Sequence, residues 1–183
     1  NVYAVCGYLG AGFPPGEFNI SHALRVMKVM GECHRRAYRL IHNIHEELGY
    51  AEPKVGLAMH MRAFVPYNAK NLWHRIACRI SEYNFQTKLN KTYMLGPEGP
   101  YADFLGLNYY RTATSGLGDG TLPNVPVNDL GWEIYPAGIV ECCQKLHALL
   151  PELPIYITEN GTADNNDAFR RRYLYEHLKV LSE

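Results

Sequence analysis

The chain has 183 residues, of which 47% are hydrophobic and 20% are charged, a composition typical of a globular protein with a core and not of a disordered chain. Lysine plus arginine equals aspartate plus glutamate at 18 each, so charge gives no reason to expect nucleic acid or a membrane surface as a partner. No apolar stretch approaches the length of a membrane span, and the N-terminus lacks the pattern of a signal peptide.

The cysteines and the glycosylation triplets bear on the compartment. Five cysteines are an odd number, and they lack metal-ligand spacing, so we expect reduced thiols in a cytoplasmic protein. Three Asn-x-Ser/Thr triplets, which begin at Asn19, Asn90 and Asn160, would favour a secreted protein instead. Such triplets arise by chance, and we give them little weight.

The N-terminal third of the chain predicts a loop followed by a long helix. Residues 1–19 are rich in glycine, proline and aromatic side chains, which favours an irregular loop. From Ser21, a candidate N-cap, apolar residues recur every three or four positions up to Leu48, and Gly49 is a natural helix end. The predicted apolar face consists of Val26, Met30, Cys33, Ala37, Leu40, Ile41, Ile44 and Leu48. His34, His42 and His45 lie on or near this helix without an acidic or cysteine partner at ligand spacing, so we predict no metal site there.

Strands and helices alternate along the rest of the chain. The expected elements are a strand over 55–64, a helix over 72–89, a strand over 103–110, a loop over 115–131, a helix over 137–150, a strand over 155–159 and a helix after Asp164 and Asp167. This alternation predicts a parallel sheet with right-handed crossovers. A closed eight-stranded barrel needs about 250 residues. We therefore predict an α/β fold, part of a (β/α)8 TIM barrel, with residues 1–183 as a single segment of the barrel domain.

Polar side chains gather where two of these strands end. Glu159 follows an apolar, β-branched run and precedes a turn signal. Asn108 and Tyr110 point to one side of their strand because side chains alternate, whereas Tyr109 points away. Trp132 lies in the loop between the two strands. A carboxylate, an amide, a phenol and an indole can together bind a sugar, and a carboxylate can attack its anomeric carbon.

Each of these residues also has an ordinary structural interpretation. Glu159 could be a solvated strand end, Tyr110 and Trp132 could be buried aromatic side chains, and Asn108 could cap a turn. The three consecutive arginines at 170–172 predict an outward-facing pair and one side chain able to turn inward towards a carboxylate.

The run Ile155-Tyr156-Ile157-Thr158-Glu159-Asn160-Gly161 resembles the nucleophile signature of family 1 glycoside hydrolases, the β-glucosidase and β-galactosidase type. Other segments resemble the same family in the same order: residues 7–16 the loop after its fourth strand, 103–110 its sixth strand, 131–136 the loop that follows and 167–178 its seventh helix. The resemblance thus extends from the loop after strand four to helix seven, and implies about strands five to seven of the barrel.

The resemblance implies roles for the four site residues. Glu159 would be the nucleophile of a retaining β-glycosidase, β-glucosidase being the expected specificity, and Tyr110 would hydrogen-bond to it. Asn108 would orient the sugar or the catalytic carboxyls, and Trp132 would line the sugar cleft. The expected substrate is a β-glucoside or a related small saccharide. No cofactor and no metal are implied. His60 stands where the family often has asparagine, which we interpret as subfamily variation.

The resemblance also implies that parts of the site lie outside this chain. The family's acid/base glutamate belongs to an Asn-Glu-Pro motif that this sequence does not contain. We therefore expect the isolated chain to be inactive, and its open strand edges to favour aggregation or docking to the remainder of the barrel. The alternative is a non-catalytic half-barrel that binds carbohydrate or assembles with a partner chain. A third hypothesis is an unrelated barrel, such as an isomerase.

Overall fold

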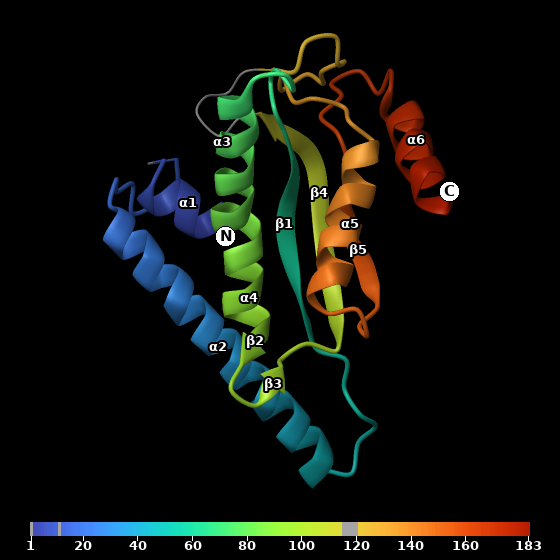
Figure 1. Ribbon diagram of the computed structural model, residues 1–183. Helices are drawn as coiled ribbons and strands as arrows, with labels where there is room; N and C mark the ends of the chain where they lie inside the picture. The colour runs from blue at the N-terminus through green and yellow to red at the C-terminus, as the bar shows by residue number, and fades with distance from the viewer. Residues whose placement is uncertain (1, 11, 115–120) are drawn as a thin grey trace.

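A parallel three-stranded sheet forms the centre of the computed structural model, which describes residues 2–10, 12–114 and 121–183. The strands are β1 (Gly56–Val65), β4 (Phe104–Thr114) and β5 (Ile155–Asn160), in the order β1-β4-β5. Both neighbouring pairs are parallel. Figure 1 shows α5 in front of the sheet, α3 and α4 alongside β1, and α2 running beside α4.

The helices connect these strands in chain order. They are α1 (Val2–Tyr8), α2 (Ile20–Glu47), α3 (Leu72–Glu82), the π-helical turn η1 (Tyr83–Thr87), α4 (Lys88–Met94), α5 (Ala137–Leu149) and α6 (Arg170–Ser182). A short antiparallel pair, β2 (Leu95–Gly96) and β3 (Gly99–Pro100), precedes β4. The predicted alternation of strands and helices around a parallel sheet is confirmed.

The core lies between the sheet and the helices in front of it. Met59 and Met61 of β1 and Leu107 of β4 are each 2% exposed or less, and they pack with Ile139 and Leu146 of α5. Because side chains alternate along a strand, the residues between them point to the opposite face of the sheet. That opposite face carries the polar side chains of the site.

The prediction of an irregular loop over residues 1–19 is wrong for its first part, because residues 2–8 form α1. The helix that follows begins at Ile20, with Asn19 rather than Ser21 as its N-cap. The Asn19 side chain accepts a hydrogen bond from the backbone N–H of His22 at 3.2 Å. The helix ends before Gly49, which adopts the left-handed conformation with φ of 67°.

The predicted apolar face of α2 is largely exposed. Met27 and Gly31 are buried where α2 contacts its neighbours, whereas Leu40 is 59% exposed and Ile44 is 41% exposed. The spacing predicted the helix correctly, but the described residues do not cover the face that the spacing defines.

The predicted helix over 72–89 is interrupted by η1. The extra residue of this π-helical turn accompanies burial of Gln86, which is 1% exposed. Its side-chain oxygen accepts a hydrogen bond from the backbone N–H of Arg62 on β1. The hydrogen bond of Gln86 therefore connects η1 to β1.

Three of the four histidines of α2, those considered above for a metal site, each have a protein partner. His34 Nε2 lies 2.8 Å from the Tyr101 carbonyl oxygen, and His42 Nε2 lies 2.9 Å from Asp103 Oδ2. His45 Nδ1 lies 2.8 Å from the carbonyl oxygen of Ala51. These contacts give the histidines structural roles that connect α2 to neighbouring loops.

All five cysteines are described, and all have free thiols. Over the described ranges, no helix is both long and apolar enough to cross a membrane. The cytoplasmic location stays a prediction.

Residues 115–120 of the predicted loop over 115–131 lie outside the described residues.

Candidate active site

Two β-bulges shape the carboxyl ends of the strands. In β4, Tyr109 pairs with Met61 and Thr112 pairs with Ala63, so β4 has one residue more than β1 over this stretch. In β5, Ile157 pairs with Leu107 and Glu159 pairs with Asn108, so β5 has one residue more than β4. A bulge breaks the alternation of side chains and redirects them. Two consecutive residues on each bulged strand therefore lie on the polar side of the sheet.

Tyr110 and Glu159 meet across β4 and β5. The Tyr110 hydroxyl donates a hydrogen bond to Glu159 Oε2. Burial, followed by this hydrogen bond, raises the pKa of Tyr110 to about 12. The phenol is therefore protonated at neutral pH and acts as a donor to the carboxylate. The sequence placed both residues at strand ends, and the structure brings them together.

Asn108 contacts Thr158 rather than Glu159 itself. The Thr158 hydroxyl donates to Asn108 Oδ1 at 2.5 Å, which leaves the Asn108 amide group available as a donor. Strict alternation would have pointed Thr158 and Glu159 to opposite faces. Thr158 is thus a residue of the site that sequence reasoning missed, because the bulge that redirects it depends on backbone pairing.

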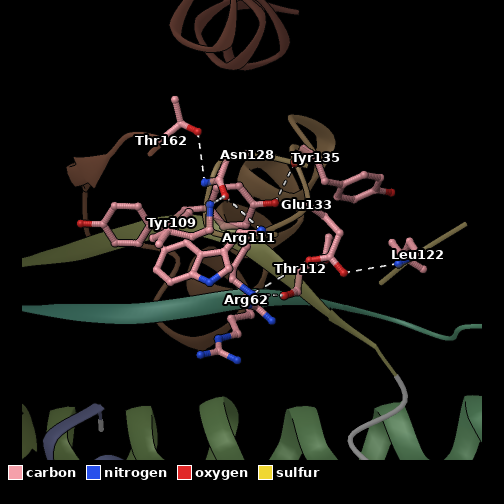
Figure 2. Close-up of polar contacts among 12 residues, drawn as sticks. Arg62, Tyr109, Arg111, Thr112, Leu122, Asn128, Glu133, Tyr135 and Thr162 are labelled. Atoms are coloured by element: carbon pink, nitrogen blue, oxygen red, sulfur yellow. Dashed lines mark hydrogen bonds and ion pairs between the residues drawn. The ribbon is translucent and has the colours of Figure 1, made fainter. Parts of the chain in front are cut away.

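Trp132 is held by a buried asparagine in the loop before α5. Asn128 is 7% exposed, and its Oδ1 accepts a hydrogen bond from the backbone N–H of Trp132 at 3.0 Å. Its Nδ2 donates to the Thr162 hydroxyl at 3.2 Å, as Figure 2 shows. The ring centroids of Trp132 and Tyr110 lie 6.3 Å apart in an edge-to-face arrangement. One side chain therefore ties the loop of the indole to the segment that follows Glu159.

These residues surround a cavity of about 500 Å³, which we call the Glu159 cavity. Tyr110, Trp132, Thr158 and Glu159 line it, together with residues 160–163 and Arg170. Asn108 is not among its described lining residues and reaches the site through Thr158. Glu159 is also the sole carboxylate among the described residues that line this cavity.

The prediction of one inward-facing arginine at 170–172 agrees with the position of Arg170. Its Nη1 donates to the Thr162 carbonyl oxygen at 2.8 Å, and its Nε lies 2.8 Å from Asp167 Oδ1. Arg172 faces outward and pairs with Glu176 at 2.7 Å. Arg170 therefore fixes the loop that forms one wall of the Glu159 cavity.

A second cavity of about 410 Å³ adjoins the first and shares Trp132 with it. Its charged lining residues are Arg62 of β1, Arg111 of β4 and Glu133, and we call it the arginine cavity. Figure 2 shows Arg62 and Arg111 at the sheet, with Glu133 beside them. Sequence reasoning missed these three residues. For Arg111 the cause is the β-bulge, because strict alternation would have placed it on the buried face with Tyr109.

His60 lies in the same layer of the sheet as the site residues. It pairs in register with Asn108, which in turn pairs with Glu159. Its Nε2 accepts a hydrogen bond from Arg62 Nε at 3.1 Å. Burial, followed by the charge of Arg62, lowers the pKa of His60 to about 4. The imidazole is therefore neutral at neutral pH.

Among the residues that the structure describes, no group of three or more His, Cys, Asp or Glu side chains could hold a metal ion. A carboxylate with a phenolic donor, beside an indole, can position a hydroxylated ligand against a nucleophile or a base.

A larger groove of about 930 Å³ lies between α1, α2, β1, η1 and α4. It flanks the edge of β1 that no described strand pairs with.

An arc of parallel strands and helices with a carboxylate, a phenol and an indole at its carboxyl edge is the arrangement of a β/α-barrel active-site segment. The profile of glycosyl hydrolase family 1 matches residues 90–183. The chain belongs to this family. Its fold is a partial (β/α)8 barrel, in which β1, β4 and β5 correspond to about strands five to seven.

Relatives and solved structures cover almost the whole chain. A β-galactosidase of Pyrococcus woesei is 26% identical over 97% of this chain and 43% of its own length. The chloroplastic galactolipid galactosyltransferase SFR2 of Arabidopsis thaliana is 29% identical over 92% of this chain and 25% of its own length. A hyperthermophilic β-glucosidase of Pyrococcus furiosus superposes with a TM-score of 0.76 at 30% identity, over 100% of this chain and 40% of that structure. The chain thus spans less than half the length of each.

Proposed function

We propose that this chain supplies the nucleophile side of the active site of a retaining β-glycosidase, with β-glucosidase as its specificity. The observation that carries the proposal is the hydrogen bond from the Tyr110 hydroxyl to Glu159 at the carboxyl edge of the sheet. Family membership supports it, because family 1 contains glycoside hydrolases. The proposed substrate is a β-glucoside or a related small saccharide.

Glu159 acts as the nucleophile in this mechanism. Its carboxylate oxygen forms a bond to the anomeric carbon as the bond to the leaving-group oxygen breaks, and a second carboxyl group gives that oxygen a proton. Water then attacks the anomeric carbon, releases Glu159 and returns a proton to the second carboxyl group. Tyr110 orients the carboxylate, Asn108 offers its amide to a sugar hydroxyl, and Trp132 packs against the sugar ring.

The proton donor in this proposal is not one of the described residues that line the Glu159 cavity. Retention of configuration requires a second carboxyl group about 5 Å from the nucleophile. Glu133 does not suit this role, because it is 3% exposed and its Oε1 accepts a hydrogen bond from the backbone N–H of Leu122 at 3.3 Å. We propose that the remainder of the barrel supplies the acid and covers the open edge of β1, with residues 1–183 as one segment of that domain.

The experiment is mechanism-based trapping in two preparations, the 183-residue chain and a completed barrel that joins it to the missing strands. A fluorinated β-glucoside with a highly activated leaving group needs no proton donor, so it tests Glu159 alone. Mass spectrometry should find the label on the peptide of Glu159, and Glu159→Gln should abolish labelling. A label on another residue, or none in the completed barrel, would refute the assignment.

Turnover of an unactivated β-glucoside separates the enzyme from the non-catalytic alternative. We expect turnover by the completed barrel and none by the chain alone. Sugar binding without turnover in the completed barrel would support the carbohydrate-binding half-barrel instead. Product analysis also distinguishes hydrolysis from transfer of the sugar to another molecule, since the name of the Arabidopsis thaliana relative describes a galactosyltransferase.

A further inference from the structure

The amide group of Asn160 connects β5 to β4 immediately beside the proposed nucleophile. Its Nδ2 donates hydrogen bonds to the Tyr109 carbonyl oxygen at 2.9 Å and to the Tyr173 hydroxyl at 3.1 Å. A carbonyl oxygen can only accept, so the NH2 group of Asn160, and not its oxygen, must face Tyr109. Both hydrogens of this amide group therefore have a partner within the protein.

The hydrogen bond to Tyr109 belongs to the shifted register that the bulge in β5 creates. After the bulge, Asn160 pairs with Tyr109 and Glu159 pairs with Asn108. Without the bulge, each residue of β5 would lie opposite the next residue of β4, so Asn160 would pair with Tyr110 instead. The side chain of Asn160 therefore stabilises the register in which the Glu159 carboxylate reaches the Tyr110 hydroxyl.

Tyr173 of α6 contacts the other residue of the catalytic pair. Its hydroxyl accepts the hydrogen bond from Asn160 and donates one to the carbonyl oxygen of Tyr110 at 3.4 Å. Burial raises the pKa of Tyr173 to about 12, so the phenol is protonated at neutral pH and can donate. Tyr173 is 2% exposed, and its ring stacks on the ring of His177 with the centroids 3.9 Å apart. Packing on α6 therefore sets the position of this hydroxyl.

We propose that Asn160 and Tyr173 are positioning residues that hold Tyr110 and Glu159 within hydrogen-bonding distance of each other. We call these two residues the Asn160 brace. The inference rests on the proposed function, since it takes Glu159 as the group that attacks the anomeric carbon. Asn160 fixes β5 next to the carboxylate, and Tyr173 fixes the backbone of Tyr110. Such support matters for rate, because a misplacement of about 1 Å at a reacting group can cost about a hundredfold.

The first test needs no turnover and uses the 183-residue chain with carbon-13 at Cζ of its tyrosines. Tyr110→Phe identifies the resonance of Tyr110, and Glu159→Ala gives its chemical shift when the carboxylate is absent. Asn160→Leu removes both donors at similar volume. We expect it to move the Tyr110 resonance towards the Glu159→Ala value at neutral pH. An unmoved resonance in a folded Asn160→Leu chain would overturn the inference.

The second test is a double-mutant cycle in the completed barrel. Asn160→Leu alone should lower kcat/KM by about tenfold, and Tyr173→Phe alone by about threefold. In combination with Tyr110→Phe, each should cost less than the product of the two single losses. The reason is that the brace acts through a hydrogen bond that Tyr110→Phe has already removed. Losses that multiply would mean that the brace supports only the fold, and would overturn the inference.

The variant Asn160→Asp adds a readout that depends on pH. Its carboxylate lacks the donor and faces the Tyr109 carbonyl oxygen, so kcat/KM at neutral pH should fall further than in Asn160→Leu. Protonation of this carboxyl group restores one donor. The ratio of its kcat/KM to the wild-type value should therefore rise as pH falls towards about 4, near the ordinary pKa of an aspartate. A constant ratio over a pH range in which circular dichroism shows both proteins folded would overturn the inference.

Tyr93→Phe is the matched control for Tyr173→Phe. Tyr93 is also 2% exposed, but its hydroxyl has no hydrogen-bond partner among the residues that the structure describes. This substitution should leave both kcat/KM and the Tyr110 resonance unchanged, and an effect as large as that of Tyr173→Phe would overturn the inference. If Asn160→Leu does not fold, Tyr173→Phe serves in both tests, since it keeps the ring that stacks on His177.

The two tests separate the Asn160 brace from the proposed function. If the completed barrel has no turnover while Asn160→Leu still moves the Tyr110 resonance, the glycosidase is refuted and the brace is not. If the completed barrel turns over β-glucosides while the resonance stays unmoved and the losses multiply, the brace is refuted and the glycosidase stands.

Discussion

The hydroxyl of Tyr110 on β4 donates a hydrogen bond to the carboxylate of Glu159 on β5. Both residues lie directly beside a β-bulge, and each bulge turns a second residue to the same side of the sheet, Arg111 on β4 and Thr158 on β5. The site is therefore made by irregularities in strand pairing as much as by the strand ends themselves. Bulges commonly redirect side chains next to active sites.

Removing the Tyr110 hydroxyl should slow the reaction without unfolding the protein. In the completed barrel, Tyr110→Phe should lower kcat/KM by about tenfold to a hundredfold, since a hydrogen bond to a charged group contributes about 1.5–3 kcal/mol. Tyr109→Phe is the matched control. Its hydroxyl donates to the Tyr135 carbonyl oxygen at 2.7 Å in the core, so its loss should affect stability rather than rate. An unchanged kcat/KM in Tyr110→Phe would contradict the role of Tyr110.

His60 should make the stability of the chain depend on pH. Burial, followed by Arg62, lowers its pKa from 6.5 to about 4, so the folded state binds its proton less readily than the unfolded state does. Its contribution is fully present above pH 6.5 and is lost as pH falls towards 4. The loss corresponds to about 3 kcal/mol. Urea unfolding at pH 7 and pH 4 measures it.

Two variants isolate the His60 contribution from that of other buried histidines. His60→Asn should reduce the difference in unfolding free energy between pH 7 and pH 4 by about 3 kcal/mol. Arg62→Gln should reduce it by less, because burial is the larger cause of the lowered pKa. If the wild-type chain and His60→Asn lose the same stability on acidification, His60 is not the group responsible.

The fold could be predicted from sequence because its signals are local. The run from Ile155 to Glu159 is mostly apolar and β-branched, and the apolar residues from Val26 to Leu48 have helical spacing. Each pattern can be recognised in its own segment, without knowing which other segments pack against it. The positions of Arg111 and Thr158 could not be predicted in this way. Each depends on a register shift between two strands, which no alternation within one strand encodes.

The environment of α2 shows a second limit of sequence patterns. The apolar face that includes Leu40 and Ile44 predicted a helix, and the helix is present. Periodicity says which residues share a face but not what covers that face. α1 likewise escaped prediction, because its seven residues are too short for a periodic pattern and adjoin a segment rich in glycine and proline.

Gly138 should resist replacement by alanine despite its position in a helix. A Cβ atom there would lie 2.1 Å from the Tyr109 hydroxyl oxygen and 2.8 Å from the Ala63 Cβ. Helix propensity alone favours alanine by about 1 kcal/mol, whereas overpacking a core costs about 1–3 kcal/mol. The clash also displaces the hydroxyl from the Tyr135 carbonyl oxygen. Urea denaturation should therefore show a less stable Gly138→Ala chain.

Gly161→Ala is the matched control for Gly138→Ala. No heavy atom lies within 4 Å of the position that its Cβ would occupy, so this substitution should leave the unfolding free energy nearly unchanged. A gain in stability for Gly138→Ala would show that the core at Tyr109 yields to the added methyl group, and would contradict the packing described.

The exposed face of α2 should behave differently in the chain and in the completed barrel. Leu40 and Ile44 lie one helical turn apart and are 59% and 41% exposed. Together with the free edge of β1, they should make the isolated chain self-associate, because exposed apolar patches and unpaired strand edges do so. Leu40→Lys with Ile44→Lys should reduce this association in sedimentation velocity and leave the melting temperature nearly unchanged.

Met27→Lys is the contrasting variant on the opposite side of α2. Met27 is 7% exposed, so an unpaired charge there should unfold the chain or lower its melting temperature strongly. In the completed barrel the Leu40→Lys and Ile44→Lys pair should itself become destabilising, by about 1.5–3 kcal/mol for each apolar side chain that the added strands bury. If the pair is harmless in both preparations, the remainder of the barrel does not cover this face of α2.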